Sequence, residues 1–365
     1  MSLDIGIIGL PDSGRTTLFN ALTGGEASTG GGSAAPHIGA AQVPDSRLKA
    51  LTDIFHPAKV VPASVTYIDI GASIKDVVEG KSISGQLLQQ ISNLDVLINV
   101  VRAFSDESIP HVEGSLDTER DISNMNLELT FSDLALLERR LSRIEASLKA
   151  AKTAERPGIL REQALIEKVK AELEKDVPVR DISLSDEETR ALSGYQLLSA
   201  KPLLIVVNIG ENQLAEAESL VAGLSERYAR AKCRASSVCG ELEMELSQLD
   251  DTAAAELRGE YLMNEPGSNR VIRLSYDLLG LISFFTVGSD EVKAWSIQSG
   301  TDAVKAAGKI HSDIERGFIR AEVISYDDMI SCGSIAEARK KGLLRLEGKN
   351  YIVQDGDVIT ILFNV

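Results

Sequence analysis

Several features that would restrict the class of this protein are rare or missing in its sequence. There are three cysteines, Cys233, Cys239 and Cys332, too few and too irregularly spaced for a disulfide framework or a zinc site. No stretch reaches the roughly 18 consecutive apolar residues of a membrane span. The N-terminus also lacks a basic region followed by an apolar signal segment. We therefore expect a cytoplasmic protein with reduced cysteines and no membrane partner.

An excess of positive charge is missing as well. The chain has 54 acidic and 38 basic side chains and a net charge of −16. Such a field repels nucleic acid, so no DNA partner is expected and any contact with RNA must be local. Residues 281–365 carry 10 Lys/Arg and 12 Asp/Glu. This segment therefore repels nucleic acid least, although it is not a basic patch.

The length and composition leave room for a large folded protein. With 365 residues, 44% of them hydrophobic, the chain can form two or three domains around a substantial core. Apolar runs suited to buried parallel strands alternate with helical segments, which predicts an α/β fold with a mostly parallel sheet and helices on both faces. These runs are IGIIG, ASVTYIDIG, LDVLINVVRAF, KPLLIVVNIG and KCRASSVCG.

A phosphate-loop pattern follows the first apolar run. In GLPDSGRTT, Gly9 and Gly14 have the spacing of G-x-x-x-x-G-K-[ST], with Arg15 in place of the lysine and Thr16 as the hydroxyl residue. In this pattern backbone N–H groups and the helix N-terminus hold phosphates, and the hydroxyl ligates Mg²⁺. Arginine keeps the charge but is planar and longer than lysine. The alternative is a Gly-rich turn between strand and helix that binds nothing.

Residues 125–200 have a different pattern. Leu134, Leu137, Leu141, Ile144 and Leu148 recur at three- and four-residue spacing, ERPG interrupts the pattern, and apolar residues at 166, 169 and 173 resume it. This predicts an inserted helical hairpin with coiled-coil character, whose charged residues form an ordinary solvated face. From about residue 280, short strands separated by Gly and Asp turns indicate a small α+β domain.

Taken together, these stretches resemble one family. LFNALT, PDSRLKAL, EPGSNRVIR, VKAWSIQSGT, AAGKIHSDIERGFIRAEVIS and GKNYIVQDGDVITILFNV, in that order, are similar to the YchF subfamily of Obg-related P-loop NTPases, over nearly the whole chain. The resemblance implies a nucleotide-binding domain at residues 1–124 and 201–279, a coiled-coil arm at 125–200 and a TGS (β-grasp) domain at 280–365. It also implies ATP or GTP as the nucleotide, Mg²⁺, and the ribosome or ribosomal RNA as partner.

The resemblance assigns roles to residues at the base and phosphates. Asn208-Ile209-Gly210-Glu211 stands where most GTPases have N-K-x-D, so strict guanine selectivity is not expected. Asn208 could otherwise be a turn residue at the end of a strand. The implied nucleotide-binding residues are Gly9, Pro11, Asp12, Ser13, Gly14, Arg15, Thr16, Thr17, Asn208, Ile209, Glu211, Ser236 and Ser237.

The residues expected around Mg²⁺ and the third phosphate depart most from the family. Thr16, Asp69 and Ser33 are the implied Mg²⁺ ligands, and Ser33 stands in STGGGSAA, where relatives have an aromatic and Pro-rich segment. Ala72 stands where relatives have the glycine of D-x-A-G, and Ser73 follows it. Ser73 replaces the apolar residue that the family has at the glutamine site of Ras-like enzymes, and neither of these two residues supplies the usual water-orienting amide.

His111, in IPHVEG, matches a histidine that the family is proposed to use for hydrolysis, because a neutral imidazole can orient or deprotonate water near pH 7. Its alternative is an ordinary surface residue.

Three functions remain open from the sequence. The first is a slow ATPase or GTPase that acts as a switch on the ribosome. The second is a non-hydrolysing scaffold or regulatory protein with a degenerate nucleotide site. The third is RNA binding through a local basic stripe, whose alternative is ordinary surface charge. The candidate stripe is Arg316, Arg320, Arg339, Lys340, Lys341, Arg345 and Lys349.

Overall fold

The computed structural model describes residues 3–25, 27, 36–70, 91–228, 230 and 232–364. The chain divides into two compact units, Met1–Gly39 with Thr66–Val271, and Ala40–Val65 with Ile272–Val365. The boundaries fall within strands β2 (His37–Gln42) and β4 (Ser64–Asp69) and within helix α11 (Gly267–Leu278). Each unit is described by itself.

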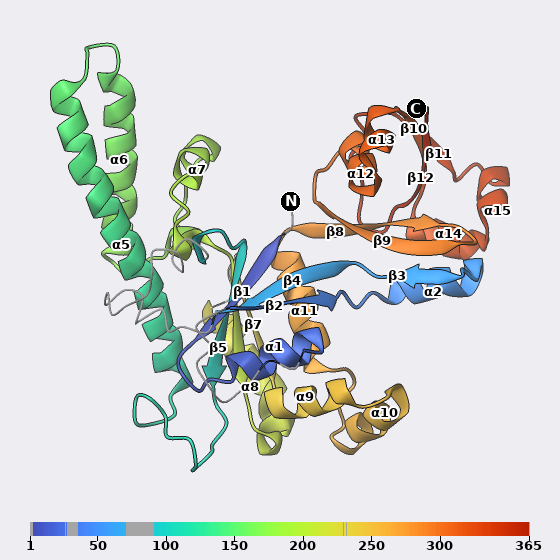
Figure 1. Ribbon diagram of the computed structural model, residues 1–365, viewed down its shortest axis with the longest axis horizontal. Coiled ribbons are helices and arrows are strands. Elements are labelled where there is room, and N and C mark those ends of the chain that lie inside the picture. The colour runs from blue at the N-terminus through green and yellow to red at the C-terminus, as the bar shows by residue number, and fades with distance from the viewer. Residues whose placement is uncertain are drawn as a thin grey trace. The chain divides into compact units, whose positions relative to one another are not determined.

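The sheet of the first unit has, among the described residues, six strands in the order β2-β4-β1-β5-β6-β7 (Figure 1). Its other strands are β1 (Asp4–Gly9), β5 (Val96–Arg102), β6 (Leu203–Asn208) and β7 (Cys233–Val238). β1 pairs in parallel with β4 and β5, and the parallel pairing continues through β6 to β7. β5 and β6 are buried along their whole length, as expected for parallel strands covered on both faces. The predicted α/β fold with a mostly parallel sheet is confirmed.

Helices connect these strands and bring the carboxyl ends of neighbouring strands to one edge. They are α1 (Arg15–Thr23), η3 (Glu211–Glu216) and α8 (Ala217–Tyr228), and α9 (Gly240–Gln248) and α10 (Asp251–Glu260) follow β7. In the core, Ile8, Leu97 and Ile205 of the strands pack with Ile122 and Met125 of helix α5 (Thr118–Ala150). The N-terminal part of α5 is therefore anchored in the sheet core.

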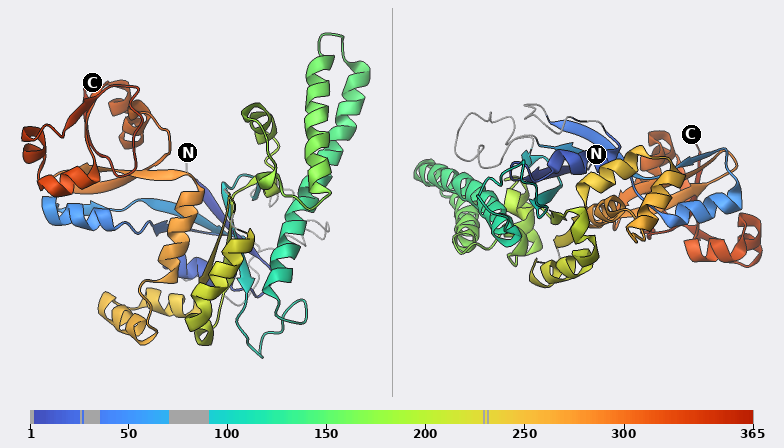
Figure 2. Two further views of the ribbon diagram at one scale, coloured as in Figure 1. Left: turned by 180° about the vertical axis from the view of Figure 1, so that it is seen from behind. Right: turned by 90° about the horizontal axis from the view of Figure 1, so that it is seen from below.

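The rest of α5 forms the predicted hairpin with α6 (Arg156–Leu173), and both views of Figure 2 show the two helices side by side. Leu137 and Ile144 of α5 are buried against Ile166, Val169 and Leu173 of α6. ERPG was expected to separate the two helices, but α6 already begins within it, at Arg156. Proline fits the first turn of a helix, where its missing N–H has no partner to lose.

A buried carboxylate holds the base of the arm. After α6 come η1 (Val179–Asp181), α7 (Asp186–Ser193) and η2 (Leu198–Ala200). Asp133 of α5 is 1% exposed and accepts hydrogen bonds from the backbone N–H groups of Leu198 (2.8 Å) and Ser199 (2.7 Å). Burial raises the pKa of Asp133 to about 6, although these two hydrogen bonds favour its ionised form.

The second unit is a mixed α+β structure, as predicted. Among the described residues its sheet has the order β11-β10-β12-β8-β9-β3. The strands are β3 (Lys59–Val61), β8 (Leu281–Val287), β9 (Glu291–Gln298), β10 (Phe318–Ile324), β11 (Arg345–Glu347) and β12 (Val358–Phe363). The helices are α2 (Ser46–Phe55), α12 (Ala303–Ile310), α13 (Ser312–Arg316), α14 (Tyr326–Cys332) and α15 (Ile335–Lys340).

The compact units differ from the three segments expected from the sequence. Residues 40–65 and 272–279, expected in the nucleotide-binding domain, belong to the unit that contains the C-terminal segment. β3 extends the C-terminal sheet by parallel pairing with β9, and Arg47 of α2 pairs with Asp355 at 2.7 Å. The strand β3 has only three residues and pairs with a strand that is distant in the sequence, so no local sequence pattern predicts it. The three-domain division stays a prediction.

Candidate nucleotide-binding site

The loop between β1 and α1 needs its two glycines. Gly14 has a φ of 88°, and a Cβ there would lie 2.1 Å from Nδ2 of Asn208. A Cβ on Gly9 would lie 2.5 Å from the carbonyl oxygen of Val100. Asp12 also has a positive φ of 58°. The left-handed residues bend the loop tightly over the N-terminus of α1, where backbone N–H groups can hold phosphate.

Thr16 and Asp69 meet at the end of the strands. β4 pairs with β1 so that Asp69 lies opposite Ile7, and the Thr16 hydroxyl donates to Oδ2 of Asp69 at 2.7 Å. Asp69 is 1% exposed, and its Oδ1 has no hydrogen-bond partner among the described residues. A hydroxyl next to a carboxylate with an oxygen to spare is the hard-oxygen donor set that Mg²⁺ prefers. These two residues therefore fit the predicted magnesium site.

Arg15 is the unusual residue of the loop, and its guanidinium is engaged with the protein. Nη1 of Arg15 donates to the carbonyl oxygen of Ile70 at 2.7 Å, directly after β4. Burial lowers the pKa of Arg15, while the nearby carboxylates of Asp69 and Asp12 act in the opposite direction. An arginine in this setting stays charged. Its charge is thus directed to the segment that follows Asp69.

Asn208 connects the phosphate loop to the base side. It is 4% exposed; its Nδ2 donates to the carbonyl oxygen of Ser13 (3.1 Å), and its Oδ1 accepts from the backbone N–H of Gly240 (3.0 Å). A simple turn residue at the end of a strand would not make both of these hydrogen bonds. The Asn208 side chain joins three segments that are distant in the sequence. The predicted Gly14, Thr16, Asp69 and Asn208 are therefore brought together.

The residues expected at the base, Ile209, Ser236 and Ser237, have buried side chains. Ile209 is 2% exposed and belongs to the core. Ser236 and Ser237 are 0% and 1% exposed, and Ser236 Oγ accepts a hydrogen bond from Nε of Arg270 at 3.1 Å. Their side chains are thus directed into the protein, which leaves the backbone of this loop as the part that can face a base.

Two residues of the base side were missed in the sequence. Arg270 of α11 also donates to the carbonyl oxygen of Ser237 at 2.8 Å, so it fixes the loop after β7. Tyr261 donates its hydroxyl to Oε2 of Glu211 at 2.7 Å, which fixes the acidic residue of the N-x-x-E sequence. Arg270 lies in EPGSNRVIR, which carried the family resemblance, but nothing local in the sequence assigned it this contact.

His111 lies below the phosphate loop with its ring enclosed. Its side chain is 6% exposed, Nε2 lies 2.9 Å from Oδ2 of Asp121, and Nδ1 accepts from the backbone N–H of Glu113 at 3.1 Å. The Asp121 contact has ion-pair distance but not the alignment of a hydrogen bond, since Oδ2 has no hydrogen-bond partner among the described residues. In this conformation neither ring nitrogen faces open solvent, so His111 is not an ordinary surface residue.

The space around His111 is small and polar. It is too narrow to hold a water molecule and is lined by Leu10, Pro11 and Ser13 of the phosphate loop, Asn99–Arg102 of β5, His111 and Asp121. Within the described part of the chain, Ser13 Oγ, Asn99 Nδ2, Arg102 Nη1 and Asp121 Oδ2 line it without hydrogen-bond partners. Unpaired buried polar atoms destabilise a conformation by about 1–3 kcal/mol each. The segment that carries His111 is therefore held by an incompletely satisfied polar cluster.

The remaining predicted residues complete the loop or lie elsewhere. Pro11 and Asp12 are exposed, Ser13 is buried and Thr17 is half-buried in the first turn of α1. Ser33, Ala72 and Ser73 lie outside the described residues. In the residues described, no cluster of three or more His, Cys, Asp or Glu side chains could hold a metal ion. Mg²⁺ in nucleotide sites is held by few protein ligands, so the Thr16–Asp69 pair needs no such cluster.

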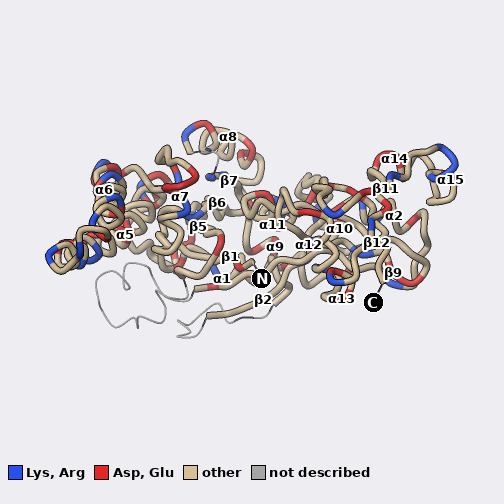
Figure 3. The backbone as a smooth tube through the Cα atoms, turned by 90° about the horizontal axis from the view of Figure 1, so that it is seen from above, with Lys and Arg blue, Asp and Glu red and all other residues tan. Residues whose placement is uncertain are grey.

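The C-terminal basic residues largely have acidic partners. Arg316 pairs with Asp313, Arg339 with Glu322, Lys340 with Glu337 and Arg345 with Glu347. Figure 3 likewise shows basic and acidic positions interleaved in this part of the backbone. This arrangement favours ordinary surface charge over a basic stripe. No helix in the part of the chain that the structure describes is both long and apolar enough to cross a bilayer.

The sheet, the phosphate loop, the Thr16–Asp69 pair and the Asn208 link together define a P-loop nucleoside-triphosphatase domain. Comparisons with known proteins support this class. Residues 4–137 match a family model described as a 50S ribosome-binding GTPase. Residues 281–364 match the YchF-GTPase_C model, described as a protein of unknown function.

Full-length relatives give the family. The chain is 38% identical to the ribosome-binding ATPase YchF of Bacillus subtilis and 39% identical to that of Pasteurella multocida, covering 100% of both chains in each comparison. It is also similar to the structure of the Schizosaccharomyces pombe YchF GTPase, with a TM-score of 0.84 and 29% identity over 99% of this chain and 98% of that one. The chain belongs to the YchF family, and the resemblance expected from the sequence is confirmed.

Proposed function

We propose that this protein binds ATP or GTP, hydrolyses it slowly, and acts as a regulatory switch on the ribosome in the cytoplasm. The observation that carries the proposal is the connected site in which Asn208 holds the phosphate loop and Thr16 bonds Asp69. The names of the bacterial relatives, ribosome-binding ATPases, support both the reaction and the partner. The partner would be the ribosome or its RNA.

Phosphate binding follows from the loop. Backbone N–H groups of residues 14–16, at the N-terminus of α1, would hold the nucleotide phosphates, with Gly9 and Gly14 allowing the close approach. Thr16 and Asp69 would hold Mg²⁺, and Ser33 is a further candidate ligand from the sequence. Bound there, Mg²⁺ would neutralise negative charge on the terminal phosphates.

Base selectivity is expected to be loose. Glu211 is longer than the aspartate of N-K-x-D and is already bonded to Tyr261, and the packing lysine is missing. The buried Ser236 and Ser237 side chains leave backbone groups to close over the base. Backbone contacts of this kind distinguish bases less sharply than a carboxylate that pairs with guanine.

His111 is our candidate for the group that orients the attacking water. Because its Nε2 lies against Asp121, this role requires the ring to leave Asp121. When the ring leaves, it gives up the contact with Asp121, which lacks hydrogen-bond alignment, and the hydrogen bond from the Glu113 N–H. An aligned imidazole contributes about 10²–10⁴-fold to a hydrolysis rate.

The test of this role uses two variants. If His111 acts on water after release, His111→Ala should lose most Mg²⁺-dependent turnover, whereas Asp121→Asn should retain or increase it. If His111 only fills the cavity, both variants should lower thermal stability and change turnover in parallel. Release of inorganic phosphate and thermal melting of each variant distinguish the two results.

The second candidate function is a scaffold that binds nucleotide weakly and does not hydrolyse it. It is favoured by one observation, the bond between Arg15 and the Ile70 carbonyl, which occupies the only basic side chain of the phosphate loop. Calorimetric titration with ATP, GTP and ADP, with and without Mg²⁺, decides between the functions. Micromolar binding with an Mg²⁺ effect and measurable turnover supports the switch, and no binding or turnover supports the scaffold.

A further inference from the structure

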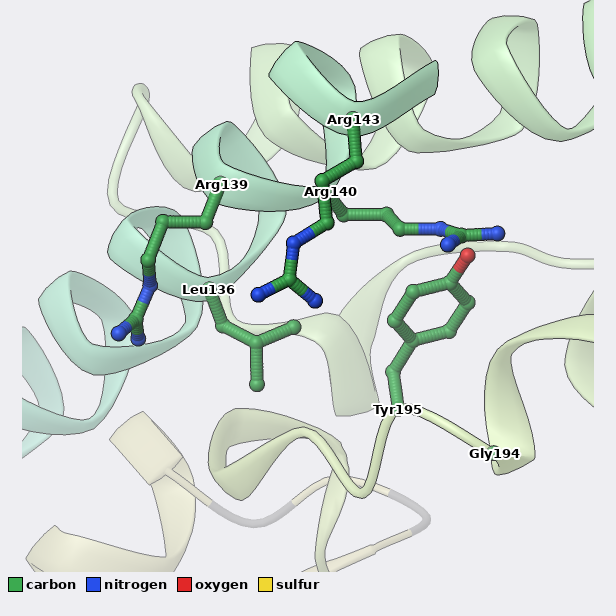
Figure 4. A pocket seen from close by; sticks show the side chains of 6 residues that line it. All are labelled: Leu136, Arg139, Arg140, Arg143, Gly194 and Tyr195. Atoms are coloured by element: carbon green, nitrogen blue, oxygen red, sulfur yellow. The ribbon is translucent and has the colours of Figure 1, made fainter. Parts of the chain in front are cut away.

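The arm carries an arginine-lined pocket far along the sequence from the phosphate loop. It has a volume of about 470 Å³ and is lined by Leu136, Arg139, Arg140 and Arg143 of α5 with Gly194 and Tyr195 (Figure 4). Pockets of 300–1,000 Å³ are typical for small ligands or single chemical groups of larger ones. No residue that lines the pocket is acidic. The pocket is therefore a local basic site in a chain with a net charge of −16.

One of the three arginines has a structural role. Arg140 donates from Nε to Oε1 of Glu162 at 2.7 Å, and the Tyr195 hydroxyl donates to the same oxygen. Figure 4 shows the Arg140 guanidinium beside the Tyr195 hydroxyl. The three side chains connect α5, α6 and the segment after α7. As a result the charge of Arg140 is neutralised and the Tyr195 ring is fixed at the wall of the pocket.

The other two arginines keep their charge available. Arg139 donates only to the backbone carbonyl oxygen of Ala135, at 3.0 Å, and no ion pair or hydrogen bond of the Arg143 guanidinium is found among the described residues. Arg139 and Arg143 are both exposed and lie one helical turn apart on the same face of α5. Like charges at this spacing destabilise a helix, and an anion bound between them would remove this repulsion.

We propose that this pocket binds the phosphate backbone of an RNA strand, with Arg139 and Arg143 on the phosphates and the Tyr195 ring against the adjacent nucleoside. The proposal rests on the proposed ribosome association. A guanidinium matches phosphate oxygens with two parallel hydrogen bonds. Aromatic rings next to cationic groups are typical of contacts with single-stranded RNA, where bases are free to stack. In Figure 4 the Arg143 guanidinium and the Tyr195 ring flank the pocket from opposite sides.

This pocket fits RNA better than the C-terminal basic residues do. Four of those residues are paired with carboxylates, so a phosphate would have to displace an acidic partner. Within the described residues Arg139 and Arg143 have no carboxylate partner that a phosphate would have to displace. The sequence-based expectation of a local RNA contact is thereby transferred to the arm.

The test uses the full chain and the double variant Arg139→Ala/Arg143→Ala. Arg161→Ala is the matched control, because Arg161 lies on α6 of the same arm, is exposed, and has no ion pair in the described part of the chain. The probes are a fluorescein-labelled oligouridylate and purified ribosomes, each titrated over a range of salt concentrations. Excess inorganic phosphate and ATP serve as competitors, to separate RNA from a free phosphate or nucleotide. Thermal melting and phosphate release confirm that each variant is folded and active.

The double variant should bind both probes about tenfold more weakly than wild type, as two lost surface charge contacts imply. The slope of log affinity against log salt should also fall by about 1.4, or about 0.7 for each lost phosphate contact. Arg161→Ala should match wild type. Equal binding by the double variant and the control would overturn the proposal, as would full competition by phosphate or ATP.

Other outcomes separate the pocket from the proposed function. Loss of ribosome binding without loss of oligouridylate binding would assign the pocket to an acidic protein surface and refute RNA. If wild type binds oligouridylate through these arginines but does not bind ribosomes, the pocket stands and the ribosome association fails. If wild type binds neither probe, both proposals fail.

Discussion

Replacing Arg15 by lysine tests directly whether the phosphate loop is weakened by its own arginine. In the structure Nη1 of Arg15 donates to the Ile70 carbonyl at 2.7 Å, so the guanidinium must give up this bond to reach a phosphate. A hydrogen bond from a charged group contributes about 1.5–3 kcal/mol. The ammonium of lysine ends about where the arginine Cζ lies, and it therefore cannot keep the same contact.

The hydrogen bond between Arg15 and Ile70 sets the expected change in nucleotide affinity. At the lower end of that range, suited to a half-buried group, releasing Arg15 from Ile70 raises nucleotide affinity about tenfold, because 1.4 kcal/mol corresponds to a factor of ten. The gain should be larger for ATP and GTP than for ADP, since the lysine of a phosphate loop contacts the β- and γ-phosphates. Calorimetric titration of wild type and Arg15→Lys with the three nucleotides measures it.

The control is Arg15→Met, which removes both the bond to Ile70 and the charge. If the charge itself serves binding, this variant should bind more weakly than Arg15→Lys. An affinity of Arg15→Lys equal to or below that of wild type would refute the reasoning, because it would show that the Ile70 contact does not compete with nucleotide. The unliganded Arg15→Lys protein should also melt at a slightly lower temperature.

Two further predictions concern buried side chains. Asn208→Ala leaves the Ser13 carbonyl and the Gly240 N–H unpaired and should lower the free energy of unfolding by about 2–4 kcal/mol in urea titrations, whereas the exposed Asn212→Ala should have little effect. Burial raises the pKa of Asp133 to about 6 from an unfolded value of about 4, so the stability it contributes is present below about pH 4 and is lost as the pH rises to about 6, in total about 2–3 kcal/mol. The difference in unfolding free energy between wild type and Asp133→Asn should fall across this interval and stay level above it; a flat difference would contradict the shift.

The parts of the fold that the sequence predicted are those with a local pattern. The apolar runs predicted β1, β5 and β6 because a buried parallel strand is apolar along most of its length, and β4 and β7 were predicted from shorter β-rich runs. The heptad-like leucines predicted α5 and α6 because apolar residues at this spacing lie on one face of a helix and pack together. By contrast, none of the apolar runs in the sequence covers β2, whose residues are HIGAAQ.

In the site, motif spacing identified residues but not their partners. The phosphate-loop pattern and the family resemblance assigned roles to Thr16, Asp69 and Asn208. Asp69 and Asn208 are the last residues of β4 and β6, and parallel pairing brings the ends of these strands to one edge of the sheet. The contacts of Arg270 and Tyr261 depend on where α10 and α11 pack, which no spacing encodes. The arm pocket likewise depends on the return of the segment after α7 to α5.

The contacts of Arg15 agree with the expectation from the sequence that departures from the family lie around the third phosphate. The loop and the base side are held by buried links through Asn208 and Arg270, which do not involve Arg15. Arg15 is instead bonded to Ile70, directly before the segment in which Ala72 replaces a glycine. A protein built in this way should hold the first two phosphates with its backbone and gain little from the third. Wild type should therefore bind ADP and ATP with similar affinity, and Arg15→Lys should separate the two in favour of ATP.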